Sequence, residues 1–135
     1  MIQARLTKDW MPTVLTVVLY LQASLASLVG LASVLGVTSF AHTMVDGRRL
    51  GVGFWAFAFM LVAVVVPQIK ENQRLFIVPL AWTAFHLTDS LFEFLVKGDA
   101  LFLPPLMVES AFLIAYVYFF RVLSKRRSSS YGSGA

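Results

Sequence analysis

The segment that decides the fold is MPTVLTVVLYLQASLASLVGLASVLGV, residues 11–37, which contains no charged residue. At a rise of about 1.5 Å per residue, a helix of this length crosses a hydrocarbon core roughly 30 Å thick. The segment is also longer than the apolar region of a signal peptide, about 7–15 residues, so we interpret it as an uncleaved first span. Together with three further apolar runs it gives the predicted spans, about residues 11–37, 50–69, 75–96 and 101–122.

The composition of the chain agrees with this interpretation. Hydrophobic residues make up 59% of the 135 residues, charged residues make up 13%, and the mean hydropathy is +0.78. So little polar surface cannot coat a soluble domain of this size. We therefore predict an all-α integral membrane four-helix bundle with up-down-up-down topology and short loops.

The segments outside the spans are short and have recognisable turn signals. Residues 1–10 form an N-terminal head, and residues 123–135 form a basic and Ser/Gly-rich tail that we expect to be flexible. The loop from Thr38 to Arg49 contains the Asp46-Gly47 dipeptide, which is typical of turns. Pro67 is expected to end the second span, and Pro104 is tolerated in the first turn of the fourth.

Basic residues predict the orientation of the chain. Eight of the 11 lysines and arginines lie on the side of the two termini: Arg5, Lys8, Lys70, Arg74, Arg121, Lys125, Arg126 and Arg127. The other three, Arg48, Arg49 and Lys97, lie on the opposite side. Loops on the cytoplasmic side of a membrane carry the excess of Lys and Arg, so both termini are expected to be cytoplasmic.

The first span is expected to be a packing helix. Its small residues form small-xxx-small pairs such as Ala23/Ser27, Ala26/Gly30 and Ala32/Gly36, which let a second helix approach closely. Gln22 in the middle of this span is expected to make an interhelical hydrogen bond of roughly 1 kcal/mol. Gly51 and Gly53, at the start of the second span, are likewise interpreted as close-packing residues.

The third span carries a polar stripe. Steps of three and four residues return to nearly the same helix face, so the polar and aromatic residues of this span share one side. They are Trp82, His86, Asp89, Ser90, Glu93 and Lys97. An ionised carboxylate in hydrocarbon is costly, so this stripe is expected to face the bundle interior or a partner chain.

Glu109 on the fourth span lies at a depth comparable to that of Asp89, so His86, Asp89 and Glu109 are expected to be able to meet. Such a cluster acts either as a structural clamp, the reading we favour, or as a proton-accepting site for a polar ligand headgroup. Glu93 has a simpler explanation, because it precedes Lys97 by four residues in the favourable orientation for an ion pair.

Several kinds of site are excluded by the residues that the sequence lacks. The chain has no cysteine, so disulfides, thiolate metal sites and iron–sulfur ligation are ruled out. A bis-histidine haem needs a second histidine at depth, whereas His42 falls in a predicted loop. The sequence also predicts no metal site. The basic residues flank apolar runs, where the membrane accounts for them, so nucleic-acid binding is not expected.

The layout resembles that of the DoxX-like group of small bacterial membrane proteins. The likeness covers about residues 11–122 and includes the entry Arg48-Arg49-Leu50-Gly51-Val52-Gly53 into span two, a Pro-containing inner loop and a fourth span that starts at proline. The resemblance implies a four-helix bundle in a bacterial inner membrane and, in some members, association with quinone- or sulfur-linked redox partners. It carries over no catalytic residue.

Two functional hypotheses follow from the sequence. In the first, which we favour, the chain is a non-catalytic accessory or scaffold subunit without a cofactor, packed against other membrane chains or against itself. In the second, it binds or converts a quinone, pigment or lipid, with His86, Asp89 and Glu109 orienting the polar head of that molecule. Ion movement along the stripe ranks last, because one narrow bundle offers little room for water.

Overall fold

A computed structural model describes residues 2–36 and 44–132, with side chains for residues 11–36 and 48–128. Within these ranges all regular structure is helical, and there are no strands. The chain divides into two compact units, residues 1–68 and 69–135, which are described separately.

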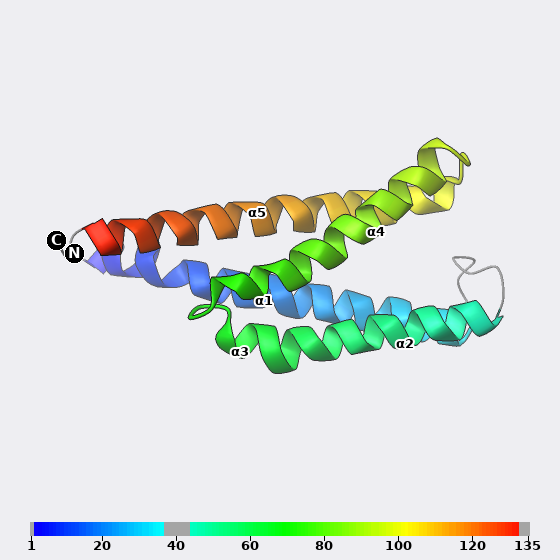
Figure 1. Cartoon of the computed structure of the whole chain (residues 1–135), viewed down its shortest axis with the longest axis horizontal. Helices are drawn as coiled ribbons and strands as arrows, with labels where there is room; N and C mark the ends of the chain where they lie inside the picture. Colours follow the sequence, from blue (N-terminus) through cyan, green and yellow to red (C-terminus); the bar gives the residue numbers. More distant parts are fainter. Residues whose placement is uncertain (1, 37–43, 133–135) are drawn as a thin grey trace. The chain divides into compact units, whose positions relative to one another are not determined.

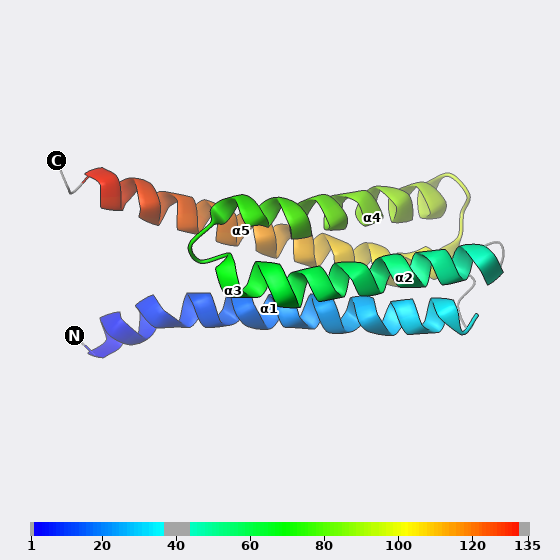
Figure 2. The same ribbon diagram turned by 60° about the horizontal axis from the view of Figure 1, so that its bottom comes forward.

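The first unit is an antiparallel helical hairpin. Helix α1 (Ile2–Val34) runs beside α2 (Met44–Met60), which continues through the π-helical turn η1 (Leu61–Val65) and the short helix α3 (Val66–Gln68). Figure 2 shows α1 and α2 side by side over most of their length. The hydroxyls of Ser24 and Ser27 donate to the carbonyls four residues earlier, at 2.8 Å each, so neither lacks a partner in an apolar environment.

Two glycines bring the helices of this hairpin into close contact. A Cβ atom on Gly30 would lie 2.9 Å from the carbonyl oxygen of Gly51. A Cβ atom on Gly51 would collide with the Cγ2 atom of Val34 and would lie 2.6 Å from the carbonyl oxygen of Gly30. Ala23 and Ala26 on α1 are buried as well. The structure therefore confirms that small residues of the first span let a second helix approach, and Gly30 lies at the contact.

The wide turn η1 lies directly before Pro67. Its backbone is looser than an α-helix, because the N–H of Val66 donates to the carbonyl of Leu61, five residues earlier. In an α-helix, the proline ring would clash with the carbonyl of the residue four positions before it, here Ala63. A π-turn is one of the known ways in which a helix accommodates such a break. As predicted, the helix ends immediately after Pro67, at Gln68.

The second unit is also an antiparallel pair of helices (Figure 1). A 3₁₀ turn η2 (Gln73–Phe76) leads into α4 (Ile77–Leu95), and η3 (Ala100–Phe102) leads into α5 (Leu103–Gly132). Both turns are capped by side chains: Asn72 accepts from the N–H of Arg74 at 3.2 Å, and Asp99 accepts from the N–H of Leu101 at 3.0 Å. These caps use the residue types that the starts of helices favour.

The rings of Phe76 and Phe120 fix the register of α4 and α5 at the end of the pair where α4 begins. Their centroids are 5.8 Å apart in an edge-to-face arrangement, which is a favourable geometry for two aromatic rings. Near the same end, Nη2 of Arg127 donates to the carbonyl oxygen of Glu71 at 3.0 Å. Gly98, at the other end, has a φ of +70°, which suits glycine in the tight link between α4 and η3.

In the part of the chain that the structure describes, four helical segments are long and apolar enough to cross a membrane: Met11–Val34, Arg48–Gln68, Gln73–Leu95 and Ala100–Ser128. They coincide with the four predicted spans, so the all-α membrane fold class is confirmed. Pro104 and Pro105 lie in the first turn of α5, as expected.

Three boundaries differ from the predictions. The expected flexible tail is helical from residue 123 to Gly132, because α5 simply continues through good helix formers such as Lys125 and Arg126. Residues 2–10 likewise form the first turns of α1. The expected Asp46-Gly47 turn is helical in the structure, and an acidic residue suits the first turn of a helix. Residues 38–43 of that predicted loop, including His42, lie outside the described residues.

Candidate functional site

The polar stripe of α4 lies along the border between its buried and exposed faces. Ser90 is buried at 5% exposure, and Trp82, His86 and Glu93 are half-buried. Asp89 and Lys97 are exposed. The prediction that these residues share one side of the helix agrees with this gradation, because their positions at 100° per residue fall within one arc.

His86 sits among aromatic rings of its own helix. Its imidazole centroid is 4.3 Å from that of Trp82, with the ring planes tilted by 47°, and 5.4 Å from that of Phe85, at 86°. His86 also interacts electrostatically with Asp89, one turn further along the helix. Trp82 thus acts as a packing surface for the imidazole.

Asp89 departs from the expectation that the carboxylates of this span point into the protein. It is exposed in the chain, although it lies six residues before the end of α4, about 9 Å inside the span. Side chains on a helix tilt toward its N-terminus, so Asp89 leans toward the middle of the span and away from the nearer membrane surface. Aspartate is also too short to reach back to water, as lysine and arginine do with their long stems.

Glu93 is accounted for within α4. Its Oε1 atom accepts from Nζ of Lys97 at 2.8 Å, in the predicted i,i+4 arrangement. The Lys97 ammonium also lies 5.7 Å from the ring centroid of Phe92. This pair therefore marks the end of the span, where charged groups meet the interface.

Glu109 on α5 is half-buried, and its Oε2 atom is shielded and has no hydrogen-bond partner among the described residues. It lies six residues into α5, about 9 Å from the start of that helix, so its depth matches that of Asp89 as predicted. Because α5 runs in the opposite direction, the side chain of Glu109 tilts back toward the near surface, unlike that of Asp89. In the described part of the chain no group of three His, Asp or Glu side chains gathers closely enough to hold a metal ion. The expected meeting of His86, Asp89 and Glu109 as a structural clamp or a ligand site stays a prediction.

Gln22 lies on α1, in the first unit, and is buried at 4% exposure. Burial suits the predicted interhelical hydrogen bond, but the bond itself stays a prediction. Gln22 belongs to the first unit, whereas the polar stripe of α4 belongs to the second unit.

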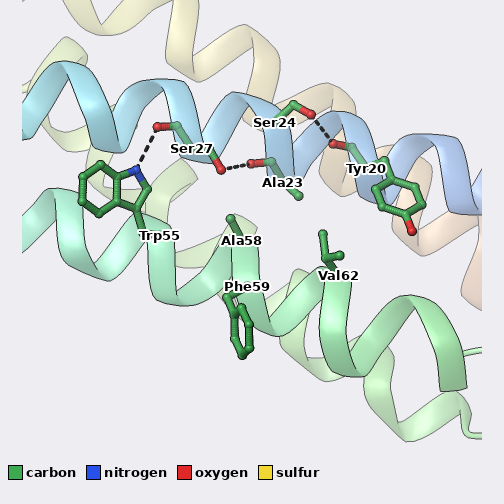
Figure 3. A pocket seen from close by; sticks show the side chains of 8 residues that line it. All are labelled: Tyr20, Ala23, Ser24, Ser27, Trp55, Ala58, Phe59 and Val62. Carbon is green, nitrogen blue, oxygen red and sulfur yellow. Dashed lines mark hydrogen bonds between the residues drawn. The ribbon is translucent and has the colours of Figure 1, made fainter.

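The α1–α2 hairpin carries a feature that the sequence analysis missed, an open groove of about 370 Å³. Figure 3 shows Ala23, Ser27 and Ala58 between the larger side chains. The lining residues are Tyr20, Ala23, Ser24, Ser27, Trp55, Ala58, Phe59 and Val62. The polar side-chain groups of Ser24, Ser27 and Trp55 are already bonded to backbone carbonyls. The lining also includes the phenol of Tyr20. The sequence signal that could have predicted this groove is the set of small residues on α1 opposite aromatic residues on α2.

Comparison of the chain with protein-family models, with curated proteins and with solved structures found no match. The resemblance to DoxX-like proteins therefore stays a prediction.

Proposed function

We propose that this chain is a non-catalytic subunit of a membrane-embedded assembly, in which it acts as an accessory or scaffold protein. The observation that carries this proposal is Asp89, an exposed carboxylate inside a membrane span. On insertion scales, an aspartate is unfavourable by about 3 kcal/mol at the centre of a spanning helix, and Asp89, six residues from the end of α4, carries part of this penalty. A second protein surface that covers Asp89 and bonds to it removes this penalty.

The location of the chain is part of the same proposal. The excess of basic residues beside the termini supports an orientation with both termini in the cytoplasm. The resemblance to DoxX-like proteins supports the inner membrane of a bacterium. Asp89 and Glu109 then lie nearer the outer surface of that membrane.

Purification in mild detergent followed by native mass spectrometry tests the proposal. The expected particle exceeds the 15.0 kDa mass of the chain by the mass of at least one further membrane chain in stoichiometric amount. Asp89→Asn should reduce the recovery of this particle. Glu93→Gln is the matched control and should leave it intact, because Glu93 is already paired with Lys97 on the same helix. A stable particle that contains a single copy of the chain and no companion contradicts the proposal.

A second candidate function is the binding of a lipophilic molecule such as a quinone, a pigment or a lipid. The α1–α2 groove favours it, because small residues such as Ala23 and Ala58 line the groove together with the aromatic residues Tyr20, Trp55 and Phe59. Ligand sites are typically concave and mostly apolar. Ala58→Leu, which narrows the groove, should abolish retention of a ligand detected by mass spectrometry or visible absorption. Unchanged retention excludes the groove as the binding site.

A further inference from the structure

We infer that the second unit binds the headgroup of an anionic phospholipid at the end where α4 begins and α5 leaves the membrane. Two segments of this unit, residues 70–74 and residues 121–127, supply the binding residues. We call these residues the basic cluster: Lys70, Arg74, Arg121, Lys125, Arg126 and Arg127. Three features carry the inference: the contacts that join the two segments, the depth of the basic residues, and the scarcity of carboxylates that could neutralise them.

Two contacts bring the segments of the basic cluster together. Phe76 follows the first segment by two residues, Phe120 directly precedes the second, and their ring centroids are 5.8 Å apart. Further along α5, Nη2 of Arg127 donates to the carbonyl oxygen of Glu71, inside the first segment, at 3.0 Å. The basic residues of both segments therefore lie at one end of the α4–α5 pair.

The basic residues of α5 lie at the depth of the lipid headgroups. Arg121 follows Leu103, the first residue of α5, by about 27 Å along the helix axis, and the hydrocarbon core is roughly 30 Å thick. Lys125 lies about 6 Å further along, which matches a headgroup layer of about 5–8 Å. Side chains on a helix tilt toward its N-terminus, so both stems lean back toward the membrane. Their charged ends therefore reach the level of the lipid phosphates.

The helical continuation of α5 also arranges these cations around a common face. Arg121 and Lys125 are one turn apart and lie within about 40° of each other around the helix. Arg127 lies about 120–160° away from them, on the side that bonds to Glu71. A guanidinium group binds two phosphate oxygens at once and an ammonium group adds a point charge, so the Arg121/Lys125 pair suits a lipid phosphate.

The chain cannot neutralise the basic cluster. Glu71 is the only acidic residue in the sequence between residues 69 and 76 or between residues 119 and 135. Where side chains are described, in residues 11–36 and 48–128, no member of the cluster is paired with a carboxylate. The acidic residues of the first unit are Asp9, which is outnumbered by Arg5 and Lys8, and Asp46, which lies at the end of the hairpin opposite to the N-terminus. The positive charge therefore remains whatever the position of the first unit.

The charge of the cluster selects the kind of lipid. Phosphatidylglycerol carries one net negative charge, whereas the choline of phosphatidylcholine places a positive charge beside its phosphate. Groups of about four to eight Lys or Arg next to a span attract the anionic lipids of the cytoplasmic leaflet. The orientation proposed above places the basic cluster in that leaflet. Binding of lipid at this end does not require the chain to be a subunit of an assembly.

The test measures which lipid contacts the full-length chain in phosphatidylcholine vesicles. A trace of spin-labelled phosphatidylglycerol or of spin-labelled phosphatidylcholine is added, and electron paramagnetic resonance reports the fraction that the protein immobilises. The probe is present in both leaflets, so the result does not depend on the orientation of the chain. We expect the association constant for phosphatidylglycerol to be about fivefold higher, equivalent to about 1 kcal/mol.

Salt and two double variants locate the preference on the basic cluster. Raising NaCl from about 0.1 M to about 1 M shortens the Debye length from about 10 Å to about 3 Å and should reduce the preference by about half or more. Arg121→Gln/Lys125→Gln should lower the preference below about twofold. Lys70→Gln/Arg74→Gln should lower it as well, because both segments contribute to the site.

The matched control is Arg48→Gln/Arg49→Gln, which removes two cations from the opposite end of the first hairpin. This variant should retain most of the preference, and circular dichroism should show equal helicity for all three variants. The inference is overturned if the wild-type chain binds the two lipids equally or if salt leaves its preference unchanged. It is also overturned if either variant of the basic cluster keeps the full preference, or if the control loses as much of it as they do.

Discussion

The indole Nε1 of Trp55 donates a hydrogen bond of 3.1 Å to the backbone carbonyl oxygen of Ser27, and so ties α2 to α1. The same indole lies over Gly30, where an added Cβ would be 2.9 Å from both Cδ1 and Nε1. Ser27 thus contributes its backbone carbonyl to this contact. Gly30 contributes its lack of a side chain, which leaves room for the indole. The hydroxyl of Ser27 takes no part, because it bonds to the carbonyl of Ala23.

Replacing Trp55 by Phe is therefore expected to destabilise the hairpin. The substitution removes the hydrogen bond and part of the ring contact, and its expected cost is about 1–2 kcal/mol. The free energy of unfolding in mixed detergent and SDS measures this loss. Ser27→Ala serves as the control and should change stability by less than about 0.5 kcal/mol, since the accepting carbonyl remains. A larger loss for Ser27→Ala than for Trp55→Phe contradicts this account.

The two glycines at the start of the second span are expected to behave differently. Gly51→Ala should lower the free energy of unfolding by about 1–3 kcal/mol, because its Cβ meets Val34 and the backbone of Gly30. Gly53→Ala meets nothing within 4 Å and should be neutral or stabilising by up to about 1 kcal/mol, as helix propensity predicts. The same SDS titration compares the two variants, and equal effects would show that the close contact at Gly51 is not formed.

This contrast shows what the sequence could and could not predict. The apolar runs were long enough to predict all four spans, since hydropathy and length suffice for that. The small residues of α1 also predicted a close helix contact, and Gly30 makes it. Which glycine of Gly51 and Gly53 meets α1 depends on the rotation of α2 about its axis. The sequence does not encode that rotation in any local pattern.

The candidate site was predictable to a similar extent. Periodicity placed Trp82, His86, Asp89 and Glu93 on one side of the third span, and it predicted the Glu93–Lys97 pair, which the structure confirms. The border between buried and exposed residues, however, runs through this stripe and leaves Asp89 on its exposed side. That border is set by how α5 packs on α4, which is long-range information.

The C-terminal extension gives another test. The bond from Arg127 to the carbonyl of Glu71 holds the last turns of α5 beside the turn that precedes η2. Arg127→Ala should speed amide hydrogen exchange in residues 123–132 by about two- to fivefold, the effect of losing one exposed hydrogen bond of roughly 0.5–1 kcal/mol. Arg126→Ala, which removes an adjacent exposed arginine, is the control. Equal exchange rates in the two variants would show that the Glu71 contact does not order this segment.

The absence of cysteine makes the orientation of the chain directly measurable, because any introduced thiol is the only one present. We expect Ala100→Cys, in the link between α4 and α5, to react with a membrane-impermeant maleimide that is added to spheroplasts, in which the outer membrane is removed and the inner membrane is intact. Ser128→Cys, near the end of α5, should react only after the membrane is opened. Both side chains are exposed in the structure, so accessibility reports the side of the membrane and not burial.

The reason for this orientation is the placement of eight basic residues beside the termini against three on the other side. The opposite labelling pattern would reverse the topology and would place Asp89 and Glu109 nearer the cytoplasmic surface.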